Sequence, residues 1–193
     1  MSFNTGQQVE LLYSLPAAIT KNTYTTIAAY TGVVGTNTVC SIPAGWAMNE
    51  GVNPVGRAFE LKVMGTIGNT AAATFANAIN INPTPGTSTN NITINTAYTP
   101  TAAVTAGWKI EAWFTITAFA TSTMTIQVNG SVTYMTVASG GAVSTAPPEQ
   151  IFSGTWTALD PRVTQYVELF GTWSASNVAN TTTVQQMLFY GLN

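Results

Sequence analysis

The sequence predicts an all-β protein, an antiparallel, jelly-roll-like β-sandwich of about ten strands. Three observations predict this class. Apolar residues alternate with polar ones at a period of two, no long segment has a helical period, and short turn motifs separate the alternating runs. Charged residues make up 6% of the chain and apolar residues 46%. Because disordered chains combine low hydrophobicity with high net charge, this composition indicates a folded domain.

The clearest alternation spans residues 108–119. One of its faces holds Trp108, Ile110, Ala112, Phe114, Ile116 and Ala118. The other face begins with Lys109, Glu111 and Trp113. Shorter alternations occupy 59–64 and 166–173. Further strands are expected at 8–14, 23–29, 36–42, 73–82, 91–98, 123–129, 131–138, 150–157 and 181–190.

Turn motifs set the expected connections. Asn129-Gly130 predicts a hairpin between 123–129 and 131–138, because both central residues of a type I′ turn need positive φ. The polar run 174–180 predicts a turn after Trp173, with the strand 181–190 returning beside the preceding one. Composition is even along the chain. We therefore expect an N-terminal arm or strand at 1–25 and a single β-sandwich domain at 26–193.

Composition also excludes several functions. The chain has no His and one Cys, so it has no Ser-His-Asp triad, no His-ligated metal, no four-Cys zinc site and no intrachain disulfide. Five Lys and Arg residues in a chain of net charge −2 argue against nucleic-acid binding. No run of about 20 apolar residues suggests a membrane span, and the first residues lack a signal-peptide pattern. We expect no cofactor, no metal and no membrane partner, with synthesis in the cytoplasm.

Carboxylates are the main acid–base groups that remain. Glu60, Glu111 and Glu168 lie in the middle of expected strands, and a glycosidase would need two such groups facing each other across a sugar. Lys62 shares a face with Glu60, and Lys109 shares one with Glu111. Ion pairs on that face, between antiparallel neighbours, are therefore the preferred interpretation. The protein is predicted not to be an enzyme, with a carboxylate-based glycosidase as the alternative.

The tryptophans divide into two groups. Trp108 and Trp173 share faces with aliphatic residues and are expected in the core, whereas Trp113 shares its face with charged residues. The proposed subunit interface consists of Glu60, Lys62, Lys109, Glu111 and Trp113. Simple exposure and sugar stacking are the alternatives for Trp113. Such a weakly charged surface is itself typical of a protein covered by other subunits. Cys40 is expected to be a buried, inert thiol.

Three stretches carry a family resemblance. They are GRAFELKVMGTI at 56–67, WKIEAWFTI at 108–116 and VELFGTWSASNVANTTTV at 167–184. In this order they resemble a group of tailed-bacteriophage virion proteins that have a jelly-roll β-sandwich domain. The resemblance covers about residues 56–190 and rests on strand and turn motifs.

The resemblance implies a structural virion protein. Its most direct form is a capsid decoration (cement) protein of the virion. Such a protein is expected to be a homo-oligomer, a trimer, and to bind the major capsid protein between capsomers. The alternative is a tail-fibre or baseplate component that binds a host glycan, which predicts a sugar-sized pocket near 83–107 or 140–149. An unrelated β-sandwich is the third possibility. Either virion role would work through binding energy alone, summed over many copies.

Overall fold

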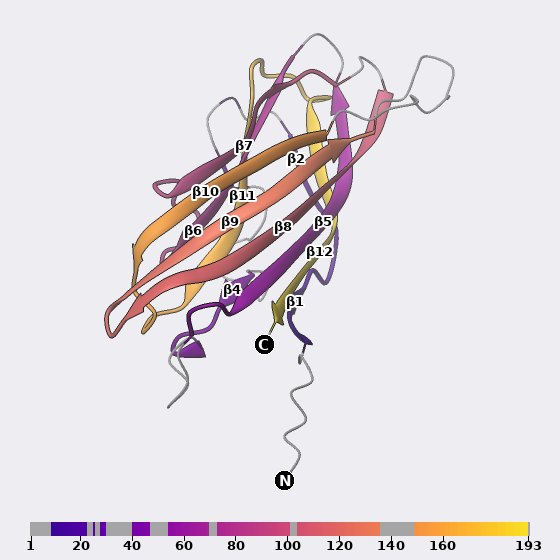
Figure 1. Cartoon of the computed structure of the whole chain (residues 1–193). Helices are drawn as coiled ribbons and strands as arrows, with labels where there is room; N and C mark the ends of the chain where they lie inside the picture. The colour runs from indigo at the N-terminus through magenta and orange to yellow at the C-terminus, as the bar shows by residue number, and fades with distance from the viewer. Residues whose placement is uncertain are drawn as a thin grey trace.

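A computed structural model describes residues 9–22, 25, 28–29, 40–46, 54–69, 73–100, 104–135 and 149–192. It is a sandwich of two antiparallel sheets, so the predicted fold class is confirmed (Figure 1). The described residues hold twelve strands, against about ten expected. Within the same residues, no helix has the length and hydropathy needed to cross a membrane.

The larger sheet has seven strands in the order β1-β12-β5-β8-β9-β10, and β2 also pairs with β12. Its longest strand, β8, corresponds to the strongest alternation in the sequence. The bounds are β1 Val9–Ser14, β2 Ile19–Asn22, β5 Ala58–Asn69, β8 Val104–Ala120, β9 Thr123–Tyr134, β10 Glu149–Leu159 and β12 Thr181–Leu192.

The smaller sheet has five strands in the order β3-β11-β6-β7, and β4 also pairs with β11. The bounds are β3 Ala28–Ala29, β4 Ser41–Ile42, β6 Phe75–Asn82, β7 Asn91–Tyr98 and β11 Gln165–Trp173. The last two strands lie beside the first two long strands, β12 against β5 in one layer and β11 against β6 in the other. In each sheet, a strand from the end of the chain thus pairs with an earlier one, which gives the sandwich its jelly-roll-like topology.

The core lies between the two sheets and is built from one face of each. The alternation predicts these residues, because successive side chains of a strand point to opposite faces. Trp108 and Trp173 are both buried, as expected, and Cys40 lies in the same cluster. Aromatic rings reinforce the packing: Phe59 stacks on Phe189 with ring centroids 5.3 Å apart.

The hairpin predicted at Asn129-Gly130 is wrong, because β9 runs unbroken through both residues. The chain reverses at 121–122 instead, between β8 and β9. Gly130 pairs with Ala112, and a Cβ on Gly130 would lie 2.6 Å from the ring of Phe152. The glycine therefore serves close packing between strand and aromatic ring, not a turn.

The segment 174–180 is a turn, but the strand that follows does not return beside β11. It crosses to the other sheet, where β12 pairs with β5, β1 and β2. Asn180 holds this crossing by donating from Nδ2 to the carbonyl of Ala175 at 2.8 Å. The sequence shows where the chain turns but not which layer it enters.

The N-terminal part joins the larger sheet where it is described. Both β1 and β2 pair with β12, β1 along residues 188–192 and β2 along residues 181–184. The division of the chain at residue 25 into an arm and a domain stays a prediction. Residues 1–8 and 23–24 of the predicted arm lie outside the described residues.

Candidate functional site

The outer face of the seven-stranded sheet brings together all five residues of the predicted interface. Glu60 lies directly opposite Trp113, and Lys62 lies directly opposite Glu111, on the neighbouring strands β5 and β8. The next rung along pairs Met64 with Lys109. We call this surface the contact face. It consists of Glu60, Lys62, Met64, Lys109, Glu111, Trp113 and Ile151, and of Leu11, which lies on the same face because Tyr190 pairs with both Leu11 and Glu60.

The charges on the contact face are paired with one another. Lys62 Nζ lies 3.0 Å from Glu60 Oε1, and Lys109 Nζ lies 3.2 Å from Glu111 Oε2. Both ion pairs form along a strand, between residues two apart. The hydrogen bond to Glu60 raises the pKa of Lys62, so the ammonium stays charged. The centre of the face is therefore polar but locally neutral.

Large apolar side chains surround these ion pairs and remain exposed. Trp113 is 45% exposed and Met64 49%, on the adjacent strands β8 and β5. Ile151, on the edge strand β10, is 85% exposed. It reaches the same face through Ser131, which pairs with both Ile151 and Glu111. An apolar patch with a neutralised centre is typical of a surface that docks on protein.

The outer face of the five-stranded sheet has a different character. Glu168, at the middle of β11, is 1% exposed and lies opposite Asn80 of β6. Its Oε2 accepts a hydrogen bond of 2.8 Å from the backbone N–H of Gly86. Burial raises the pKa of Glu168, and the Gly86 hydrogen bond lowers it in part. The three ion pairs among the described residues do not include this carboxylate.

Gly86 belongs to the loop 83–90, which joins β6 to β7 and is held at several points. Asn82 accepts from the N–H of Thr84 and donates to the hydroxyl of Thr89, both at 2.9 Å. The carbonyl of Asn90 accepts from Trp156 Nε1 at 2.7 Å. Because Trp156 lies on β10, the loop connects the two sheets at this edge of the sandwich.

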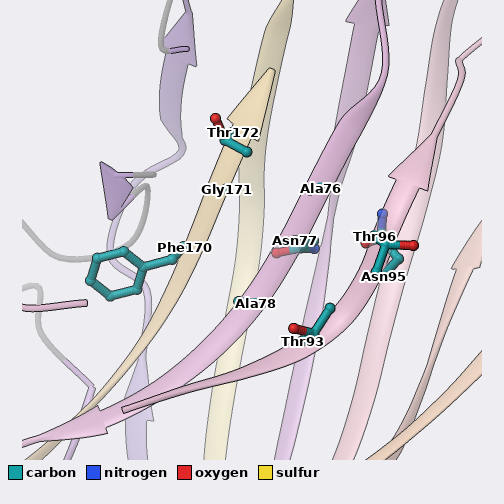
Figure 2. A pocket seen from close by; sticks show the side chains of 9 residues that line it. All are labelled: Ala76, Asn77, Ala78, Thr93, Asn95, Thr96, Phe170, Gly171 and Thr172. Atoms are coloured by element: carbon teal, nitrogen blue, oxygen red, sulfur yellow. The ribbon is translucent and has the colours of Figure 1, made fainter. Parts of the chain in front are cut away.

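A hollow of about 220 Å³ opens on the same outer face, across β11, β6 and β7 (Figure 2). Small residues give it depth. It is lined by Ala76, Asn77, Ala78, Thr93, Asn95, Thr96, Phe170, Gly171 and Thr172. Asn95 is committed to the fold, because it accepts from Tyr134 Oη at 2.7 Å and donates to the carbonyl of Phe75 at 2.8 Å. The exposed polar groups at the hollow are therefore threonine hydroxyls.

The three candidate catalytic carboxylates do not converge. Glu60 and Glu111 lie on the outer face of the larger sheet, and Glu168 lies on the outer face of the smaller one. Glu168 is thus separated from the other two by the whole core. Glu60 and Glu111 lie on one face in diagonal register positions, and each forms an ion pair with the lysine two residues away. Among the described residues, no group of three metal-ligating side chains comes together.

Sequence reasoning found the contact face but missed the hollow. Alternation assigns Trp113 and its strand neighbours to one face, and the register between β5 and β8 places Glu60 and Lys62 beside them. The hollow depends on alanines and threonines from three strands, and no motif marks it. The segment 83–107, where a pocket was expected, supplies Thr93, Asn95 and Thr96. The second expected location, 140–149, lies outside the described residues except for Glu149.

No protein-family model and no curated protein sequence matches the chain. Among solved structures, it is similar to the CBM2 module of the evolved Dit of Lactobacillus casei BL23 phage J-1, with a TM-score of 0.33 and 12% identity over 97% of both chains. It is also similar to a legume lectin-like domain from Entamoeba histolytica, with a TM-score of 0.30 and 9% identity over 97% of this chain and 90% of that one. Values this low carry no functional information about the present chain.

Proposed function

We propose that the protein is a structural component of a tailed-phage particle and acts as a capsid decoration protein. The observation that carries this proposal is the contact face, where Trp113, Met64 and Ile151 stay exposed around two internal ion pairs. The sequence motifs that resemble virion jelly rolls supply the biological setting. The protein binds the major capsid protein, and its own copies, without nucleic acid or membrane.

The physical basis is the low cost of covering such a face. Burying an exposed tryptophan removes apolar area from water at roughly 25 cal/mol per Å². Lys62 and Lys109 already have carboxylate partners, so docking leaves no charge unpaired. Aromatic side chains near the centre of an interface carry most of its binding energy, which gives Trp113 the main role.

Assembly multiplies these contacts. A trimer presents three equivalent surfaces to a shell, and weak contacts on one lattice add as avidity. The mechanism requires no chemical step. Each copy holds neighbouring capsomers together, and the summed contacts resist outward pressure on the shell.

Sedimentation velocity at micromolar concentration tests the self-association. We expect a trimer for the wild-type chain and dissociation for Trp113→Ala and Ile151→Ser, with unchanged circular dichroism. Val178→Ser is the matched control, because Val178 is exposed outside the contact face, in the turn after β11. A monomeric wild-type protein, or equal dissociation of the control, would contradict the proposal.

Localisation on intact particles tests the decoration role separately. Gold-labelled antibodies against the chain should mark the head of the particle. Particles without the protein should release their DNA at a lower temperature than complete ones. Label on the tail would instead support the second candidate function.

The second candidate is a tail component that binds a host glycan, and the hollow favours it. Its volume of about 220 Å³ is of the size of one sugar ring, and Thr93, Thr96 and Thr172 offer hydroxyls around an alanine floor. Ala78→Leu fills the hollow, with Ala106→Val in the core as a control for stability. Glycan-array binding that the first variant abolishes would establish this function.

A further inference from the structure

Glu168 and Asn80 form a buried polar pair whose hydrogen bonds do not balance. The two residues are directly opposite in register, so their Cβ atoms are about 4.5–5.5 Å apart on the same face of the sheet. Asn80 is fully buried and Glu168 is 1% exposed. An ionised carboxylate can only accept hydrogen bonds, which makes its neighbours decisive.

The side-chain amide of Asn80 has a partner for its nitrogen but none for its oxygen among the described residues. Its Nδ2 donates to Oδ1 of Asn91 at 2.9 Å, and Asn91 belongs to β7. Since β7 and β11 flank β6 on opposite sides, we infer that the Oδ1 of Asn80 faces β11, where Glu168 lies. This Oδ1 has no hydrogen-bond partner among the described residues. In this arrangement, two acceptors face each other with no donor between them.

Among the described residues, no ion pair compensates the charge of Glu168. The strand β6 and the loop 83–90 contain no titratable residue, and neither do β3 and β4. On β11 itself, Tyr166 lies two residues away on the same face. The thiol of Cys40, next to β4, belongs to the core cluster on the other side of the sheet. An ionised Glu168 would thus be a buried charge without a cation among these elements.

We propose that Glu168 is a proton-dependent latch for the loop 83–90. In the protonated form, one carboxyl oxygen donates its proton to Oδ1 of Asn80, while Oε2 accepts from the N–H of Gly86. The carboxyl proton, Oε2 of Glu168 and Oδ1 of Asn80 then all have partners, and the loop is closed. When the carboxyl group loses its proton, the charge faces Oδ1 of Asn80, and the loop opens to let water reach the carboxylate.

The latch acts next to the hollow. Asn80 is two residues from Ala78, which lines the hollow and pairs with Thr93 of β7. Opening the loop frees the end of the β6–β7 pair on which the hollow is built. It also breaks the hydrogen bond from Trp156 Nε1 to the carbonyl of Asn90, so loop opening affects β10 of the larger sheet. The hollow is therefore better ordered at acidic pH.

Carboxyl ¹³C NMR and amide exchange of the full chain test the latch together. We expect the Glu168 carboxyl to titrate above the ordinary value of 4.5. Between 4.5 and that midpoint, loop opening measured at the Gly86 amide should increase by up to about tenfold per pH unit and level off above it. Glu168→Gln should keep the amide protected at every pH, because its amide both accepts from Gly86 and donates to Asn80. Asn80→Ala should lower the midpoint.

The control is Glu60→Gln, on the contact face, which should leave the titration of Glu168 unchanged. A Glu168 midpoint at or below 4.5 would overturn the latch, as would pH-dependent Gly86 exchange that persists in Glu168→Gln. Protection restored by millimolar Ca²⁺ at high pH would show that a cation, not a proton, fills the gap. If Glu168→Gln does not fold, the wild-type carboxyl titration still decides the question.

Discussion

The two outer faces of the sandwich differ in how they accommodate carboxylates and large aromatic side chains. On the seven-stranded sheet, the carboxylates of Glu60 and Glu111 have lysine partners, and the large aromatic Trp113 is 45% exposed. On the five-stranded sheet, the carboxylate of Glu168 has no cation among the described residues, and the large aromatic Phe170 is 1% exposed. One outer face keeps its large aromatic side chain exposed, whereas the other buries it.

This difference shows that an outward-pointing residue is not always a surface residue. Phe170 is buried but does not belong to the core cluster between the sheets. The five-stranded sheet therefore buries side chains on both faces, and the seven-stranded sheet buries one face only. Under the proposed function, folding and assembly would therefore depend on different surfaces of the protein.

The largest effect is expected from a matched pair of aromatic truncations, one on each outer face. Phe170→Ala should lower the free energy of unfolding by about 3–5 kcal/mol, as for a buried aromatic. Trp113→Ala should change it by less than about 1 kcal/mol, because much of its ring already contacts water. Urea denaturation of both variants at a concentration where the wild type is monomeric provides the comparison.

Assembly should show the reverse order for the same two variants. Phe170→Ala, once folded at low temperature, should still associate, and Trp113→Ala should not. Equal losses of stability in the two variants would remove the distinction between the faces. Loss of association in Phe170→Ala alone would move the interface to the five-stranded sheet.

Glu168→Gln provides the second test, through the pH dependence of stability. Burial raises the pKa of Glu168 in the folded state above its ordinary value of 4.5, so the folded protein binds this proton more tightly than the unfolded chain does. The stabilisation is complete below 4.5 and is lost as pH rises through the folded-state pKa. Glu168→Gln should therefore be more stable than the wild type at neutral pH and equally stable in acid.

Thermal unfolding of the two proteins across this pH range measures the difference. Glu60→Gln is the control on the opposite face, where the carboxylate already has Lys62 as its partner. A Glu168→Gln variant that is less stable than the wild type at neutral pH would show that the ionised carboxylate supports the fold. The charged form would then be the native one.

Much of the sandwich was predictable because alternation is a property of one strand at a time. The faces of β8, including the buried Trp108 and the exposed Trp113, follow from a period of two. Errors arose where two elements meet. The Asn129-Gly130 pair predicts a turn, but the role of Gly130 depends on the ring of Phe152, which comes from another strand. The crossing after Trp173 depends on the pairing of β12 with β5, which lies in the other sheet.

The candidate sites divide along the same line. The contact face was predictable, since its five expected residues need only alternation and the pairing of β5 with β8. The burial of Glu168 does not follow from alternation, which places it on an outer face just as it does Glu60 and Glu111. Its face lacks the lysine that stands beside each of the other two, but the loop 83–90 and Asn80, which adjoin its carboxyl group, are distant in sequence.

The smallest expected effect concerns the ion pairs of the contact face. Glu111→Gln removes the partner of Lys109, and both side chains are more than one-third exposed. Exposed pairs of this kind contribute about 0.2–1 kcal/mol, because water screens them and ordering the side chains costs entropy. Urea denaturation of the monomer should therefore hardly detect the change.

Association should detect it, because docking would then bury Lys109 without its carboxylate. A variant that associates as tightly as the wild type in low salt would place Lys109 outside the covered area, and would reduce the interface to Trp113 and its apolar neighbours.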